Sequence, residues 1–96
     1  MTYIYPAVVY KEYEDEPYVF VLADVGIVCE GDTIEAGLLE AKSQLKIYIQ
    51  CVKKFEADLP SPTSYERLVK KFVDQRVLLV ECDVAEDDYG EFTKIF

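Results

Sequence analysis

The sequence of 96 residues has no histidine and no tryptophan, and it has only four glycines. Without histidine, the Ser-His and Cys-His pairs that activate most enzyme nucleophiles cannot form, which leaves only Cys-Lys or Ser-Lys pairs formally open. Gly26 and Gly31 are isolated turn residues, so there is no glycine-rich loop that could hold a phosphate. We therefore expect no catalytic residues, no bound metal and no cofactor.

Positive charge is also scarce. Ten Lys and Arg residues stand against 19 Asp and Glu residues, which gives a formal net charge of -9. Direct binding to nucleic acid needs clustered basic side chains, so this balance argues against it and favours a basic protein partner. Apolar residues make up 51% of the chain, enough to build one packed core. The length and composition predict a single domain over residues 1–96.

No apolar run is long enough to cross a bilayer, and the first ten residues lack the basic start of a signal peptide. Cys29, Cys51 and Cys82 are widely spaced and form no CxxC pair, which argues against a structural zinc site. We interpret all three as buried or half-buried, reduced residues, and we expect the protein to be cytoplasmic.

Three short strands are predicted in the first third of the chain, over residues 3–10, 18–22 and 27–30. They are rich in β-branched and aromatic residues and are joined by short polar links, which indicates an antiparallel meander. Pro6 has no N–H to donate, so it should lie at an open edge, at a bulge or at the start of its strand.

A long amphipathic helix follows. Asp32 is the predicted N-cap, and Glu35 lies three residues later, where its side chain can bond back to the cap. Gly37 is unfavourable inside a helix, which suggests that the helix needs it in order to approach the sheet closely. The helix ends near Lys53 and Lys54, which suit its negative end. The apolar stripe that should face the sheet consists of Ile34, Leu38, Ala41, Leu45, Ile49 and Val52.

A proline-rich exit at residues 59–62 ends this helix, and Ser64 is the predicted cap of a short helix over residues 65–72. Residues 77–80 form a continuous apolar run, which predicts a strand buried on both faces. A strand-helix-strand crossover of this length predicts parallel pairing. The whole pattern belongs to the α/β class, more narrowly an α+β two-layer sandwich of three antiparallel strands, a long helix and a fourth strand.

The last twelve residues, 85–96, form an acidic C-terminal tail. Phe92, Ile95 and Phe96 make an apolar patch in it that no neighbouring residue covers. We expect this patch to dock on the body of the same chain, with a second chain as the alternative.

Several motifs occur in an order that resembles the HicB-like antitoxin family, over about residues 3–84. The motifs are Tyr5-Pro6-Ala7-Val8, Tyr18 after an acidic turn, an Asp-Gly turn, Gly31-Asp32-Thr33 with Glu35-Ala36, and Leu59-Pro60-Ser61-Pro62. The sequence departs from the family in two places. It has Asp24-Val25-Gly26 where family members have the motif DLPG, and it has Glu16-Pro17 where the link between the first two strands of family members has a glycine.

The resemblance implies a partial ribonuclease-H-like fold and a non-catalytic role. Members of this family bind and occlude HicA, a small basic toxin that cleaves messenger RNA. Many members also carry a C-terminal DNA-binding module. This sequence leaves no room for one before Phe96, so we expect no DNA-binding domain in it.

The acidic residues are the candidates for binding a basic toxin, because charge complementarity raises association rates and specificity. The alternative is that these residues are only solvated surface. The candidates are Glu14, Asp15, Glu16 and Asp24 in the first part of the chain, and Glu86, Asp87 and Asp88 in the tail.

Two further functions remain open. One is a stand-alone homo-oligomer, a dimer or tetramer, with a structural or regulatory role and no toxin partner. The other is a metal-dependent nuclease, which needs several converging carboxylates. Its candidates would be Glu12, Asp24, Asp32, Glu81 and Asp83, each of which also fits a plainer role as a cap, a turn or a solvent-facing residue.

Overall fold

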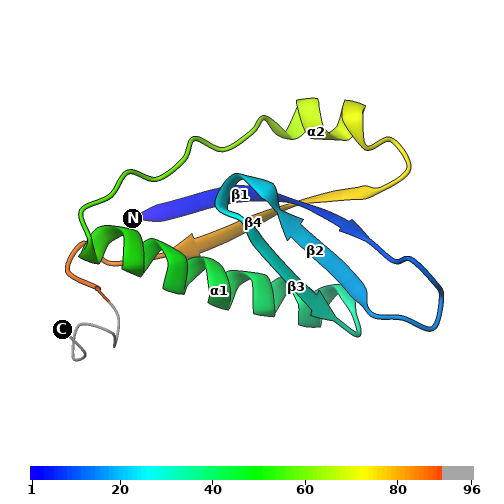
Figure 1. Cartoon of the computed structure of the whole chain (residues 1–96), viewed down its shortest axis with the longest axis horizontal. Coiled ribbons are helices and arrows are strands. Elements are labelled where there is room, and N and C mark those ends of the chain that lie inside the picture. Colours follow the sequence, from blue (N-terminus) through cyan, green and yellow to red (C-terminus); the bar gives the residue numbers. More distant parts are fainter. Residues whose placement is uncertain (90–96) are drawn as a thin grey trace.

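A computed structural model describes residues 1–89, and the predicted apolar patch at Phe92, Ile95 and Phe96 lies outside this part. The described residues form one four-stranded antiparallel sheet in the order β3-β2-β1-β4, with a long helix on one face, which confirms the α+β prediction (Figure 1). Within this part, neither helix is long and apolar enough to cross a membrane. The elements are β1 (Thr2–Tyr10), β2 (Tyr18–Leu22), the 3-10 turn η1 (Ala23–Val25), β3 (Ile27–Gly31), α1 (Ile34–Lys54), α2 (Tyr65–Lys71) and β4 (Arg76–Asp83).

The first three strands form the predicted antiparallel meander. β2 has its predicted bounds, and β1 and β3 are each one residue longer than predicted. β2 pairs with β1 only from Val8 to Tyr10, so β1 has no strand on that side at Pro6. Pro6, which has no N–H to donate, therefore lies where one edge of its strand is open, as predicted.

The fourth strand pairs with β1 in the antiparallel direction, so the predicted parallel pairing is wrong. The ladder runs over eight pairs, from Thr2 with Asp83 to Val9 with Arg76. A parallel strand would require the chain to travel the length of the sheet once between β3 and β4. It travels this length twice, because α1 carries the chain back to the start of β1 and residues 55–64 carry it forward again (Figure 1).

The prediction that the fourth strand is buried on both faces is also wrong. Val77 and Val80 are buried, but Leu78 is half-buried and the Leu79 side chain is 51% exposed. α1 has 21 residues and covers its face of the sheet, whereas α2 has seven and covers only part of the opposite face. We call that second face of the sheet the outer face.

The hydrophobic core lies between α1 and the sheet. Alternate side chains of β1 point to this side, because successive residues of a strand face opposite ways. Tyr5, Ala7 and Val9 therefore meet the stripe of α1, and Phe20 of β2 lies among them with no exposed surface. The predicted stripe is confirmed, with Ala41, Leu45 and Ile49 fully buried, Ile34 and Leu38 packed against the core, and Val52 half-buried.

The N-cap of α1 is one residue later than predicted. Thr33, not Asp32, has the extended backbone of a cap, and its Oγ1 accepts a hydrogen bond of 3.0 Å from the N–H of Ala36. Both residue types are good caps, so the sequence could not separate two adjacent candidates. The predicted cap of α2 is confirmed, because Ser64 Oγ accepts a hydrogen bond of 3.4 Å from the N–H of Arg67.

Gly37 allows α1 to approach the sheet closely, as predicted. A Cβ atom at this position would lie 2.1 Å from a ring carbon of Phe20. A Cβ at Gly31, the last residue of β3, would lie 2.2 Å from the backbone nitrogen of Gly37. The two glycines therefore let the end of β3, the first turns of α1 and the buried Phe20 ring occupy the same small space.

We expect Gly37→Ala to destabilise the protein by about 1–3 kcal/mol, because the added methyl group overpacks the core against Phe20. If the helix had free space at this position, the same change would stabilise the protein by about 1 kcal/mol. The sign of the change in unfolding free energy therefore shows whether the close contact exists. Urea unfolding followed by circular dichroism measures it. Ser43→Ala, at an exposed position of the same helix, is the matched control and should not destabilise. A Gly37→Ala variant as stable as the parent would contradict the close contact.

Candidate functional site

Three of the predicted partner-binding residues lie together at the tip of the β1–β2 hairpin. Glu14, Asp15 and Glu16 are all exposed, and the N–H of Glu16 closes the turn with a hydrogen bond of 3.1 Å to the carbonyl of Tyr13. Lys11 steadies the base of the loop, since its Nζ donates to the carbonyl of Glu14 at 3.1 Å. We call residues 12–16 the acidic hairpin.

Tyr13 is an exposed aromatic residue in the middle of the acidic hairpin, with 62% of its surface accessible. Sequence reasoning did not single it out, because nothing in a sequence with eight tyrosines marks which ones are exposed. Aromatic side chains beside charged residues are common energetic anchors of protein interfaces. The hairpin therefore combines negative charge with an apolar contact point.

Asp24 has a structural role that accounts for its carboxylate. It accepts two hydrogen bonds from Thr63, of 2.9 Å from the backbone N–H to Oδ2 and of 2.6 Å from the hydroxyl to Oδ1. Tyr5 makes a second tie nearby, since its hydroxyl donates to the carbonyl of Pro60 at 2.6 Å. These contacts fasten residues 55–64 along the side of the sheet where β2 has ended.

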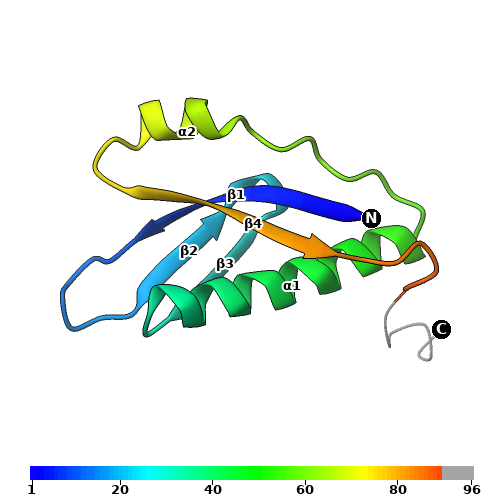
Figure 2. The same cartoon turned by 180° about the vertical axis from the view of Figure 1, so that it is seen from behind.

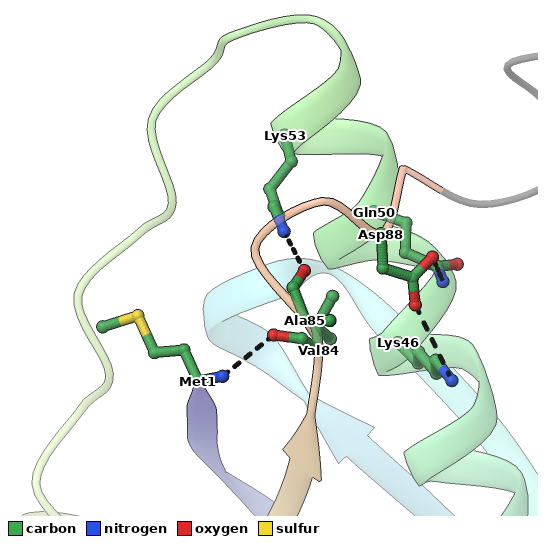
Figure 3. Close-up of polar contacts among 7 residues, drawn as sticks. All are labelled: Met1, Lys46, Gln50, Lys53, Val84, Ala85 and Asp88. Atoms are coloured by element: carbon green, nitrogen blue, oxygen red, sulfur yellow. Dashed lines mark hydrogen bonds and ion pairs between the residues drawn. The ribbon is translucent and has the colours of Figure 1, made fainter.

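The tail residues Glu86, Asp87 and Asp88 lie at the other end of the molecule, against the C-terminal half of α1. Glu86 and Asp87 are exposed. Asp88 is held, because Gln50 Nε2 donates to its Oδ1 at 2.8 Å and Lys46 Nζ lies 4.0 Å from its Oδ2 (Figure 3). The structure thus shows two of the three tail carboxylates available at the surface.

The start of the chain and the end of β4 hold each other in place beside this tail. The N-terminal ammonium group of Met1 donates to the carbonyl of Val84 at 3.0 Å, and the N–H of Val84 donates to the carbonyl of Met1 at 3.0 Å (Figure 3). Lys53 donates to the carbonyl of Ala85. Residues 84–89 therefore fold back on α1, and Figure 2 shows this end of β4 beside the start of β1.

The structure does not bring the two acidic groups together. The acidic hairpin follows the end of β1, whereas the tail follows β4 where β4 meets the start of β1. A strand of nine residues that rises about 3.3 Å per residue separates the two groups by about 26 Å. A small partner can therefore contact only one of the two groups. Contact with both would require a partner that extends along most of the sheet.

The five candidate nuclease carboxylates also lie apart. Glu12 belongs to the acidic hairpin, Asp24 is bonded to Thr63, and Asp32 lies just before α1. Glu81 and Asp83 are exposed on β4. Within residues 1–89, no three His, Cys, Asp or Glu side chains lie close enough to hold a metal ion.

An apolar cavity that sequence reasoning missed lies between α2 and the outer face of the sheet. Its volume is about 270 Å³. The only sequence signal for it was the pair Leu68 and Phe72, four residues apart and so on one side of the short helix. The cavity is lined by Pro6, Val8, Tyr10, Val21, Ala23, Asp24, Thr63, Leu68, Phe72 and Gln75.

The three cysteines differ in exposure, which corrects one prediction. Cys29 is buried and Cys82 is half-buried, as expected, but Cys51 is exposed on α1. Burial raises the pKa of the Cys29 thiol, and Glu40 adds to the rise. Burial and Asp83 raise the pKa of Cys82, while Lys46 and Lys42 oppose this. Cys51 was misassigned because it lies beside Gln50, at the border between the buried stripe and the exposed side of the helix.

We expect one fast-reacting thiol in the folded protein. The thiolate is the reactive form, so thiols whose pKa is raised and which are buried react slowly near pH 8. Ellman's reagent should label Cys51 first and all three cysteines only after unfolding in urea. Cys51→Ser should remove the fast phase and Cys82→Ser should leave it. A fast phase that survives Cys51→Ser would contradict the assignment.

Removing the Asp24 carboxylate should destabilise the fold. We expect Asp24→Ala to cost about 1–3 kcal/mol in urea unfolding, because Thr63 loses two hydrogen-bond acceptors in a half-buried site. Asp58→Ala, at an exposed position of the segment that Asp24 fastens, is the matched control and should stay within about 0.5 kcal/mol. Equal stability of both variants would leave Asp24 available as a partner-binding residue.

Comparison with family models and with curated proteins found no match to this sequence. Among solved structures, the antitoxin HicB of Burkholderia pseudomallei aligns with a TM-score of 0.76 and 18% identity, over 92% of this chain and 69% of that chain. A chain of a toxin-antitoxin complex from Streptococcus pneumoniae aligns with a TM-score of 0.73 and 20% identity, over 86% and 70%. The chain therefore has the fold of the HicB antitoxin, as the resemblance in its sequence implied.

Proposed function

We propose that this protein is an antitoxin that binds and neutralises a basic, HicA-type toxin that cleaves messenger RNA. The observation that carries the proposal is the likeness to the HicB antitoxin over 92% of the chain. A similar structure is part of a toxin-antitoxin complex, which supports a protein as the partner. In this proposal the chain acts in the cytoplasm as one binding domain without catalysis and without direct contact with nucleic acid.

The distribution of charge supports a basic partner. The formal net charge is -9, and such a field attracts cationic proteins and speeds their association. Among the described residues, no ion pair neutralises the three carboxylates at the tip of the acidic hairpin. They can therefore meet basic side chains without first losing a partner in their own chain.

Of the seven predicted partner-binding residues, we assign the first contact to Glu14, Asp15 and Glu16. Asp24 is engaged by Thr63, and Asp88 by Gln50 and Lys46. Tyr13 adds an aromatic residue that is 62% exposed, whereas Tyr89 of the tail is 43% exposed and lies under Lys53 Nζ at 5.5 Å. Glu86 and Asp87 form a secondary site for a partner long enough to reach along the sheet.

A homo-oligomer without a toxin partner, dimeric or tetrameric and with a structural or regulatory role, is the second candidate function. The observation that favours it is the open sheet. Its two edge strands, β3 and β4, each have one side unpaired within the described residues. Unpaired strand edges readily associate with other strands.

The proposal predicts that a gene beside this one encodes a small basic protein, and the decisive experiment uses that protein. We expect co-expression of this chain to relieve growth arrest by that protein. The triple variant Glu14→Gln/Asp15→Asn/Glu16→Gln should slow association by about tenfold or more, because it removes electrostatic steering. Stopped-flow or surface plasmon resonance measures the association rate.

The control variant, Glu40→Gln/Glu56→Gln/Asp58→Asn, removes the same number of charges at exposed positions of α1 and of the segment after it, outside the hairpin. It should slow association much less than the hairpin variant. Equal effects of the two variants would refute the hairpin as the contact site. Failure of the basic protein to bind the unaltered chain would refute the antitoxin proposal itself.

A further inference from the structure

The cavity between α2 and the outer face of the sheet has the size of a small-ligand site. Its volume is about 270 Å³. An engineered apolar cavity of about 150 Å³ is already large enough to bind benzene. The cavity beneath α2 therefore has room for an aromatic ring that carries a short side chain.

The lining of the cavity is apolar on both of its sides. Pro6 and Val8 of β1 and Val21 of β2 form the floor, and Leu68 and Phe72 of α2 form the roof. Ligand pockets in proteins are mostly apolar, with a few polar groups that orient the ligand. A ligand that enters this cavity removes apolar surface from water on two sides, which is the main source of affinity for a small molecule.

Both ends of α2 are fastened to the sheet, so the cavity is formed before any ligand arrives. Thr63, which directly precedes the cap of α2, donates its N–H and its hydroxyl group to Asp24 at 2.9 and 2.6 Å. At the other end the chain enters β4, where Val77 pairs with Val8. A preformed site loses less conformational entropy when it binds a ligand.

Asp24 gives the wall of the cavity a negative charge. Its two hydrogen bonds come from neutral groups of Thr63, and no ion pair neutralises it within residues 1–89. An ionised carboxylate has about four acceptor sites, so two remain for a ligand. Among the described residues, no Lys or Arg side chain contributes to the lining. The wall therefore favours a cation and disfavours an anion.

We propose that this cavity binds a small aromatic amine in its ammonium form. The ring lies between α2 and the outer face, where Tyr10 and Phe72 provide aromatic contacts. The ammonium group donates to the carboxylate of Asp24, and hydrogen bonds between two charged groups are stronger than those between neutral ones. This site goes beyond the proposed antitoxin function and does not depend on it.

The test compares two probes that differ only in the polar group, 2-phenylethylamine and 2-phenylethanol. Titration of the isotope-labelled chain at pH 7, followed by NMR, gives a dissociation constant for each probe and shows which residues respond. About 0.3 M salt screens the attraction of the amine to the net charge of the whole chain. We expect a dissociation constant of about 1 mM or lower for the amine and about tenfold weaker binding of the alcohol.

Two variants with matched controls locate the site. Val21→Phe fills the cavity with a ring and should abolish the binding of both probes. Its control is Val28→Phe, because Val28 pairs with Val21, is 62% exposed and does not line the cavity. Asp24→Asn should remove the tenfold preference for the amine and leave the alcohol bound as before. Asp58→Asn, at an exposed position, is its control and should keep the preference.

Circular dichroism shows whether each variant is folded, and if Asp24→Asn loses both probes, the preference measured in the unaltered chain decides. Equal affinity of that chain for the two probes would overturn the proposal. Amine binding that survives Val21→Phe, or a preference that survives Asp24→Asn, would also overturn it. If the amine does not bind and Val21→Phe instead weakens the complex with the basic protein, the cavity receives a side chain of the partner and the proposal is wrong.

Discussion

The close contact between α1 and the sheet at Gly37 is the constraint on which the rest of the fold depends. The Phe20 ring fills the space that a side chain at Gly37 would need, so the helix approaches the sheet with Gly37 facing Phe20. This orientation turns Ala41, Leu45 and Ile49 into the core. The helix ends beside the start of β1, and the following segment returns along the sheet from there.

The direction of β4 follows from that return. Residues 55–64 contain no regular secondary structure, yet they are held along the sheet by the bonds from Tyr5 to Pro60 and from Thr63 to Asp24. Tyr5 belongs to the core-facing row of β1 and Asp24 to the turn after β2, so no local pattern marks either side chain as a partner of this segment. As a result of these bonds, β4 starts at the end of β1 and forms the outer strand of an antiparallel sheet.

The same topology distributes the charge of the chain. The acidic hairpin and the tail lie at opposite ends of β1, so the predicted partner-binding carboxylates of these two segments form two separate surfaces. The cations of α2 gather on the outer face and leave the hairpin almost purely acidic, with Lys11 at its base.

The sequence by itself determined the elements and their order, because apolar periodicity, caps and proline-rich exits act over a few residues. It predicted β2 to the residue, the stripe of α1, the Ser64 cap and the role of Gly37. The tertiary structure alone decided the direction of β4, the half exposure of Leu79, the exposure of Cys51 and the engagement of Asp24 and Asp88. These depend on contacts between residues far apart in the chain, such as Asp24 with Thr63 and Gln50 with Asp88, and no local pattern specifies which partners meet.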